Sequence, residues 1–241
     1  MQQILNVLIF SGLAGFATIV GILLTLYYES WARKNSIYII SFAAGTLLAG
    51  AFFHIIPESL ELYENAMIVV ILGFLLFYLL ENTALVHPCK EEDCPKHNFS
   101  EIAIIGLGFH SLLDGIAIGV GFEISTSLGL ITTLAVLLHE LPEGISAMGL
   151  MLHAKVERRR AVIFSLLVAL ATPLGALGAY VFLKDITLQI LGILLSLAAG
   201  SFIYIAASDL VPETHREFRK QNALILIFGI VFVYLVGMGF G

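Results

Sequence analysis

Two stretches, IAIIGLGFHSLLDGIAIGVGF (102–122) and LGLITTLAVLLHELPEGISAMGLML (128–152), decide the fold class of this chain. Each is apolar over at least the roughly 20 residues that a helix needs to cross the hydrocarbon core of a bilayer. Each also carries a histidine, three intervening residues, a carboxylate and a glycine, as 110–115 and as 139–144. An ionisable side chain at the bilayer centre costs about 2.5–3.5 kcal/mol, so the five in these two stretches require a compensating partner such as a bound cation.

The composition places the whole chain in a membrane. Hydrophobic residues make up 59% of the chain and charged residues 12%, against about 25% charged in soluble domains. The apolar runs are too long for lipid-facing β-strands, which need about 10 residues of alternating character, so we expect an all-α integral membrane fold. The longest polar connection, 87–100, is too short to form a core of its own, and 1–241 is expected to be one transmembrane domain. Eight spans are predicted, at about 4–28, 37–57, 66–86, 102–122, 128–152, 161–183, 188–211 and 223–240.

The basic residues predict the orientation of these spans. If the amino terminus lies outside the cytoplasm, eleven of the twelve Lys and Arg residues fall on the cytoplasmic side, and only Lys184 falls on the other. This bias satisfies the positive-inside rule, so both termini are expected to be non-cytoplasmic in a multi-pass protein of the cell (inner) membrane. No basic residue precedes the first apolar run, which is therefore interpreted as a retained helix rather than a cleaved signal peptide.

An internal repeat relates the second and seventh spans. SFAAGTLLAGAFFHIIPES (41–59) and SLAAGSFIYIAASDLVPET (196–214) share a serine, Ala-Ala-Gly, a later alanine and Pro-Glu in constant register. The predicted topology runs these spans in opposite directions, so the repeat is an inverted one, as in many secondary transporters. The fourth and fifth spans also oppose each other and carry the paired motif. We expect a 3+2+3 arrangement with the chemistry in the central pair.

Helix geometry brings the central side chains to one point. At 3.6 residues per turn, His110 shares a face with Asp114, and His139 shares a face with Glu143. Two imidazoles and two carboxylates form a mixed ligand set that suits zinc and also accepts iron(II), manganese or cadmium. Ser111 and Glu140 lie one step around the helices, where they could line a second and weaker cation site. The alternative is that these side chains only bind helices together, a role that uncharged Ser, Thr or Asn would fill at lower cost.

The motifs resemble those of the ZIP family of divalent-metal transporters, with prokaryotic GufA-like and ZupT-like members closest in length. The span-five pattern is complete at His139, Glu140, Pro142, Glu143 and Gly144, while Ser111 replaces the commoner asparagine in span four. The resemblance implies a divalent cation transporter that moves zinc, and also iron, manganese or cadmium, toward the cytoplasm by alternating access. It also implies a homodimer and a binuclear site. The primary ligands would be His110, Asp114, His139 and Glu143, and the secondary ligands Ser111, Asp114, Glu140 and Glu143.

Two further groups are candidates for the ends of a transport path. His54 and Glu58, one turn apart in span two, could pass a cation from the outside to the centre, and Asp209, Glu213 and His215 in span seven could form the exit. A hydrogen-bonded histidine and a solvated helix end are the plain alternatives.

The polar loop carries a further cluster of possible ligands. His87, Cys89, Cys94 and His97 could form a zinc-sensing or zinc-buffering site in a reducing cytoplasm, although their spacing matches no closed zinc module. The short basic run 155–160 is interpreted as an anchor to lipid headgroups and not as a nucleic-acid site.

Two other functions can be compared with transport. Intramembrane zinc proteases use His-Glu-x-x-His on one helix and an Asp in a second segment, but here Glu143 stands where the second histidine should be. Pro142 would also disturb the turn that aligns two imidazoles. No catalytic residues and no catalytic cofactor are therefore expected, and the protein is not predicted to be an enzyme. A metal-sensing receptor without flux has the same ligand requirements and stays open. The expected partners are divalent metal ions and the lipid bilayer.

Overall fold

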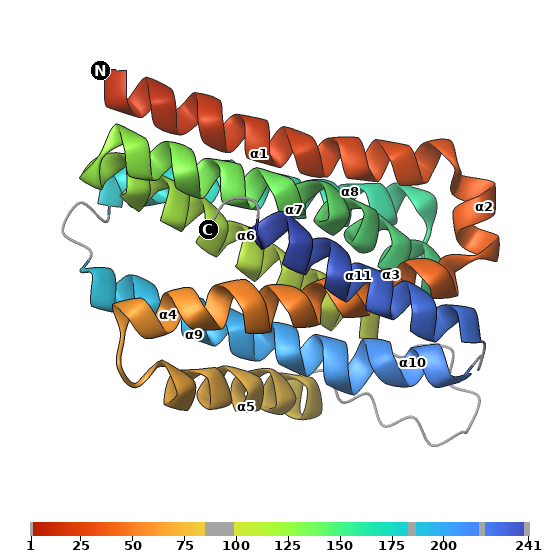
Figure 1. Cartoon of the computed structure of the whole chain (residues 1–241). Helices are drawn as coiled ribbons and strands as arrows, with labels where there is room; N and C mark the ends of the chain where they lie inside the picture. The colour runs from red at the N-terminus through yellow and green to blue at the C-terminus, as the bar shows by residue number, and fades with distance from the viewer. Residues whose placement is uncertain (1, 85–98, 183–186, 217–219, 239–241) are drawn as a thin grey trace.

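The computed structural model describes residues 2–84, 99–182, 187–216 and 220–238, and every regular element within these ranges is a helix (Figure 1). The all-α prediction is therefore confirmed for the described part of the chain. The elements are α1 (Gln2–Tyr27), α2 (Glu29–Lys34), α3 (Ser36–Ala49), the π-helical η1 (Gly50–Ile55), α4 (Ile56–Leu62), α5 (Ala66–Ala84), α6 (Phe99–Ile124), α7 (Thr126–His153), α8 (Arg158–Phe182), α9 (Leu188–Tyr204), the π-helical η2 (Ile205–Leu210), α10 (Val211–Arg216) and α11 (Lys220–Met238).

Not all of these helices are long enough to span a bilayer by length and composition alone. Within the described ranges, five segments pass this test, and α7 is a sixth if its two parts, inclined by 42°, form one span. Apolar segments in α5 and α11 are shorter. The helices indicate a multi-pass membrane protein with five or six spans established by length. The five segments are Gln3–Tyr27, Ser36–Leu62, Ala103–Ile124, Arg158–Val181 and Leu188–His215.

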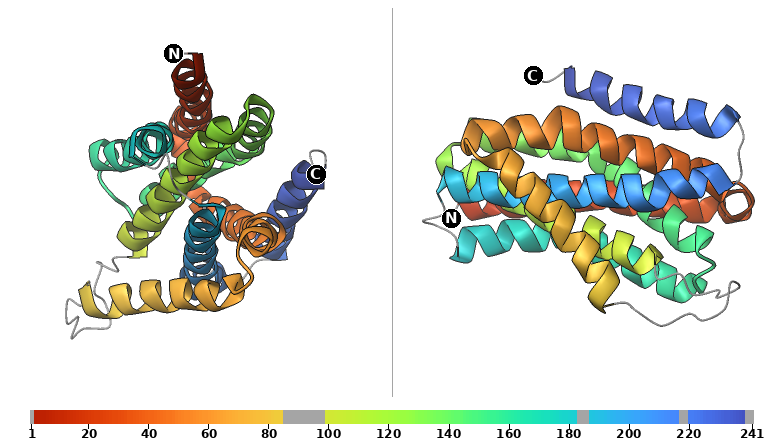
Figure 2. Two further views of the ribbon diagram at one scale, coloured as in Figure 1. Left: turned by 90° about the vertical axis from the view of Figure 1, so that its left-hand side faces the viewer. Right: turned by 90° about the horizontal axis from the view of Figure 1, so that it is seen from below.

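The long helices form two groups that lie side by side (Figure 2). In the first group, α1 packs along α7 and α6 packs along α8. In the second, α3 packs along α11 and α5 packs along α9. Contacts of α7 with α3, and of α6 with α9, join the two groups. Both sequence motifs lie in the first group, on helices that also face the second.

The repeat between the second and seventh spans is visible as two π-helical turns at matching positions. Pro57 and Pro212 follow η1 and η2, and proline has no N–H to donate to the preceding turn. The backbone widens instead, so that Ile56 N–H bonds to the carbonyl five residues earlier, as does Val211 N–H. The helical path therefore continues to Leu62 and Arg216, beyond the ends predicted at residues 57 and 211. The two copies run in opposite directions, since α4 packs against α9 and α10 packs against α3.

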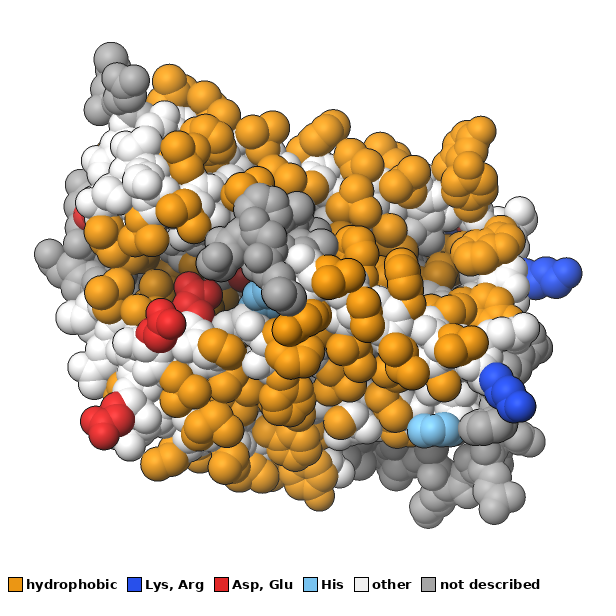
Figure 3. Space-filling model, in the orientation of Figure 1, with side chains coloured by type: hydrophobic (Ala, Val, Ile, Leu, Met, Phe, Trp, Pro, Cys, Tyr) orange, Lys and Arg blue, Asp and Glu red, His pale blue; other side chains and the backbone are white. Residues whose placement is uncertain are grey.

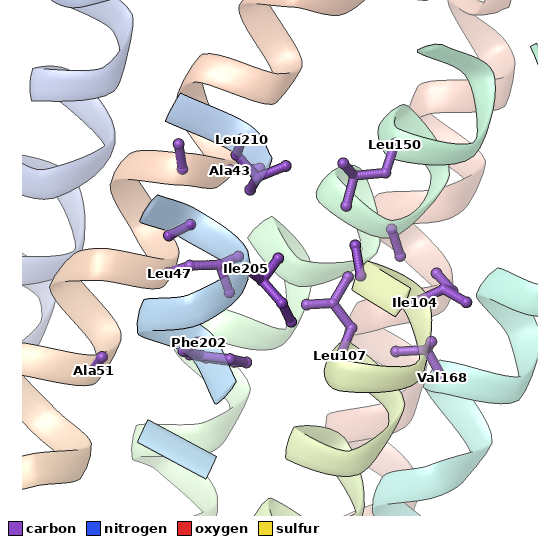
Figure 4. Close-up of a cluster of buried hydrophobic side chains, with 14 of the residues drawn as sticks. Ala43, Leu47, Ala51, Ile104, Leu107, Leu150, Val168, Phe202, Ile205 and Leu210 are labelled. Carbon is purple, nitrogen blue, oxygen red and sulfur yellow. The ribbon is translucent and has the colours of Figure 1, made fainter. Parts of the chain in front are cut away.

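Small and aliphatic side chains fill the space between the two groups (Figure 4). Ala43, Leu47 and Ala51 of the second span lie near Phe202 and Ile205 of the seventh in this buried cluster. Lipid chains are as apolar as these residues, so helix association depends on close packing, which small residues permit. The cluster thus brings α3 and α9 near the helices that carry the motifs.

Hydrophobic side chains cover most of the face seen in Figure 3. Basic side chains lie at the right-hand end of this face and acidic side chains at the left-hand end. Large exposed apolar residues such as Phe16, Ile68 and Leu224 belong to three different helices. An apolar belt between two polar ends is the surface that a bilayer requires.

Candidate metal site

Helices α6 and α7 bring both motifs together. They are joined by the single residue Ser125, whose side chain accepts a hydrogen bond from Leu128 N–H and so begins α7. Nε2 of His110 lies 3.0 Å from Oδ2 of Asp114. Nε2 of His139 lies 2.7 Å from the same oxygen. The predicted sharing of one face by positions i and i+4 is therefore seen for His110 and Asp114.

A second set of carboxylates adjoins this triad. Asp114, Glu140 and Glu143 each offer an oxygen within 4.8 Å of the others, and the same limit holds for His110, Asp114 and His139. Ser111 Oγ donates to Glu143 Oε1 at 2.6 Å and to the carbonyl of Leu107 at 3.0 Å. The six candidate ligands are thus brought together around Asp114.

The site is buried except on one side. His110, Asp114 and Glu143 are 3%, 6% and 7% exposed, and Glu140 is fully buried. The His139 side chain is 35% exposed, so an ion would reach the site past this residue. The ring of Phe202, from the second group of helices, lies 4.1 Å from the His110 ring between centroids.

Two buried ligand atoms lack a hydrogen-bond partner within the described part of the chain: Nδ1 of His110 and Oε2 of Glu143. Nearly all buried polar atoms in proteins have a partner, so an unpaired carboxylate oxygen beside two other carboxylates indicates a place for a cation. Three neighbouring carboxylates would repel one another strongly in a low-dielectric interior without positive charge. Two imidazoles and several carboxylate oxygens form a donor set that fits zinc.

Sequence reasoning missed two side chains that bind Glu140. Thr18 of α1 donates a short hydrogen bond to Glu140 Oε2, and Thr172 of α8 donates to Oε1 at 2.7 Å. Single threonines in apolar helices are common, so neither stood out by type or position.

The entrance candidates are not among the ligand clusters that the described residues form at the centre. Nε2 of the half-buried His54 is 3.3 Å from the carbonyl oxygen of Val233. Glu58 lies one turn later in α4, and its charge acts on Asp114 and His139 through space.

The three exit candidates do not form one cluster. Glu213 pairs with His153 at the end of α7, where Oε1 and Nε2 are 3.1 Å apart. The other nitrogen of His153 is 2.9 Å from Ser36 Oγ. Asp209 has no such pair among the described residues: the charge that acts on it is the like charge of Glu81 in α5, which accepts a short hydrogen bond from the Tyr204 hydroxyl. His215 is exposed and lines a separate cavity of ≈ 170 Å³ with Thr214, Ala223 and others. The candidate loop ligands His87, Cys89, Cys94 and His97 lie outside the described residues.

Known proteins share this sequence pattern. A family profile described as ZIP Zinc transporter matches residues 86–237. Zinc transporter ZIP13 of Pongo abelii is 29% identical over 229 residues, which cover 87% of this chain and 68% of that protein. Zinc transporter ZIP13 of Mus musculus is 26% identical over 269 residues, or 90% of this chain and 73% of that protein. Zinc transporter ZIP10 of Mus musculus is 35% identical over 160 residues, and the match covers only 18% of its length.

The family match covers more than half of the chain and includes both motifs, the fourth to seventh predicted spans and most of the eighth. Proteins of this family are transporters and not enzymes, which removes the protease alternative. The resemblance seen in the motifs is confirmed at the level of the family: this chain belongs to the ZIP zinc transporter family.

Proposed function

We propose that this protein carries zinc across a membrane toward the cytoplasm, through a site formed by His110, Asp114, His139 and Glu143. The observation that carries the proposal is the shared oxygen of Asp114, to which both histidines are directed from different helices. A zinc ion here would be the transported substrate. The ligand set also tolerates iron(II), manganese and cadmium, because ligand type alone discriminates weakly among these ions.

Glu140 and Ser111 form the secondary position of the proposed site. Glu140 lies within reach of the carboxylates of Asp114 and Glu143. Ser111 Oγ is directed at Glu143, but a neutral hydroxyl is a weak ligand. We therefore assign one strongly bound zinc ion to the site and a second, weaker one to this position.

Alternating access is the proposed mechanism, and the two helix groups support it. All six ligands lie on α6 and α7 in the first group. Phe202 and the proposed entrance and exit residues belong to the second. Apolar and small side chains fill most of the interface between the groups. Movement of one group past the other would therefore change which side of the membrane reaches His139.

The path through the protein follows from the charged groups near this interface. Glu58 would attract the ion from outside by its negative charge, and His54, one turn earlier, would pass it toward the central site. Glu213, paired with His153, would receive it at the opposite end of α7. Asp209 and His215 would bind the released zinc ion separately on the same side. The loop residues would buffer zinc there, and they are His87, Cys89, Cys94 and His97.

Several features of the intact transporter belong to the same proposal. They are eight spans in a 3+2+3 arrangement across one domain of residues 1–241, both termini outside the cytoplasm, the cell (inner) membrane as location, a homodimer, and membership of the prokaryotic GufA-like or ZupT-like branch. The positive-inside distribution supports the orientation.

Zinc flux into reconstituted vesicles tests the proposal. His139→Ala and Glu143→Ala should abolish flux while the purified protein remains monodisperse, because each removes a ligand. Glu123→Ala, at the end of α6 and outside the site, is the matched control and should transport normally. Normal flux from either site variant would refute the assignment, and zinc binding without flux in the wild type would favour a receptor.

A further inference from the structure

Glu140 is held by one threonine on each side of the site. Its two carboxylate oxygens accept hydrogen bonds from Thr18 in α1 and Thr172 in α8, and all three residues are fully buried. These two helices contribute none of the six ligands. The hydroxyls therefore connect the candidate site to the two other helices of its own group.

The two threonines occupy equivalent positions in two similar helix pairs. Residues 17–21 and 171–175 both have the pattern Ala-Thr-x-x-Gly. A Cβ added at Gly144 would overlap the carbonyl oxygen of Thr18, and one added at Gly115 would overlap that of Thr172. Each motif glycine thus lets its helix approach the backbone of the threonine that binds Glu140.

The second glycines of the pattern make the return contacts. A Cβ at Gly21 would overlap the carbonyl oxygen of Leu141, three residues before Gly144. A Cβ at Gly175 would overlap that of Leu112, three residues before Gly115. The packing of α1 on α7 is therefore repeated by the packing of α8 on α6. The motifs of α6 and α7 differ at the residue after the histidine, which is Ser111 in α6 and Glu140 in α7.

This hydrogen bonding differs from that of other buried threonines. Thr25 donates to the carbonyl of Gly21 and Thr133 to that of Gly129, each one turn back in its own helix. Thr18 and Thr172 donate across helices to a carboxylate, and hydrogen bonds to a charged acceptor are roughly twice as strong as neutral ones. An ionised carboxylate has about four acceptor positions, so two remain after the threonines are bound. These can serve a cation shared with Asp114 and Glu143.

We propose that Thr18 and Thr172 are positioning residues that fix the carboxylate of Glu140 in the metal site before a cation arrives. Side chains that bind and orient a metal ligand typically contribute 10–100-fold to affinity. A carboxylate held from both sides loses little freedom when it binds the ion, so the interaction is not weakened by the cost of ordering Glu140. The inference rests on the proposed function, because it assigns the two threonines to the same zinc site.

Valine and serine substitutions separate positioning from packing. Thr18→Val and Thr172→Val keep the branched shape and remove the donor, so we expect the Kd of the second, weaker zinc ion, which Glu140 binds, to rise about 10–100-fold while the strongly bound ion keeps its affinity. Thr18→Ser and Thr172→Ser keep the hydroxyl and should restore most of the loss. Thr25→Val is the matched control, since its hydroxyl bonds only within α1, and it should behave as the wild type.

Zinc binding to purified protein, measured by calorimetry, gives a readout independent of flux. The Kd of the second zinc ion should rise in the valine variants, and Thr18→Ala and Thr172→Ala replace them if they are not monodisperse. An unchanged Kd of the second ion in the donor-free variants would overturn the inference, as would serine variants as impaired as valine ones. If the wild type binds zinc without transporting it, the proposed function fails, and the Kd comparison still decides the role of the threonines.

Discussion

His139 in α7 directs its Nε2 atom at Oδ2 of Asp114 in α6 across 2.7 Å, and this contact links the two motif helices. Asp114 also lies 3.0 Å from His110 Nε2, so one carboxylate serves both imidazoles. It is therefore the central residue of the candidate site.

Replacing Asp114 should weaken zinc binding strongly, even when the new side chain has the same size. Asp114→Asn preserves the volume but removes the negative charge between two histidines, so we expect zinc affinity to fall by more than about tenfold, or about 1.4 kcal/mol. Flux and calorimetric Kd would be measured together, with Glu123→Gln as a control carboxylate outside the site. A wild-type Kd for Asp114→Asn would show that the ion binds elsewhere.

The number of bound metals should depend on Ser111. Its hydroxyl is a weak zinc ligand and donates to Glu143, so we expect one tightly bound zinc ion per chain and a second at lower occupancy. Ser111→Asn adds an amide oxygen and should raise the second occupancy, measured by elemental analysis after dialysis. Two zinc ions at full occupancy in the wild type would contradict this prediction.

The sequence predicted which candidate side chains lie together at the centre better than it predicted their surroundings. The i, i+4 spacing was sufficient to bring His110 and Asp114 together, because a regular helix fixes that relation. The exit residues were grouped by nearness in the chain, yet Glu213 pairs with His153 of α7, whereas the like charge of Glu81 in α5 acts on Asp209. A π-helical turn changes which residues share a face, and a proline in an apolar run does not by itself predict such a turn.

The threonine contacts could be predicted only with knowledge of which helices pack against each other. Thr18 is far from Glu140 in the sequence, and only the packing of α1 on α7 brings them together. The repeated Ala-Thr-x-x-Gly pattern was available as a signal, but its meaning depends on the facing motif glycines. The long apolar runs, in contrast, were enough to predict the helices, since backbone groups in a bilayer must be satisfied within each segment.

Acidification should weaken a surface ion pair outside the spans. Glu29 in α2 is 2.9 Å from Arg33 and 2.8 Å from Arg158. Slight burial acts to raise the pKa of Glu29, but the hydrogen bonds and charges of the two arginines outweigh it and hold the pKa below the ordinary 4.5. A carboxylate whose pKa is lower in the folded state stabilises the fold at every pH above its unfolded-state pKa. This contribution is lost as the pH falls through the folded-state pKa.

The effect should be small and sensitive to salt. Exposed ion pairs contribute about 0–1 kcal/mol, so Glu29→Gln should lower the melting temperature slightly at pH 7 and low ionic strength. The difference in melting temperature from the wild type should shrink below pH 4.5, the ordinary pKa of this carboxyl group, and in high salt. Thermal unfolding at both pH values checks this, and a difference that grows on acidification would reverse the sign we derive.

Alanine substitution of glycines should give opposite results at closely packed and at open positions. At Gly115 and Gly144 a Cβ would overlap a threonine carbonyl, and forcing extra atoms into a packed interior costs about 1–3 kcal/mol. At Gly12 in α1 and Gly178 in α8 an added Cβ meets nothing within 4 Å, so alanine should stabilise the helix by about 0.5–1 kcal/mol. Melting of the purified variants would therefore separate the two classes. Equal behaviour of all four would mean that the close approach of α1 to α7 and of α8 to α6 does not hold in the native protein, and that the threonines are not brought to Glu140 in this way.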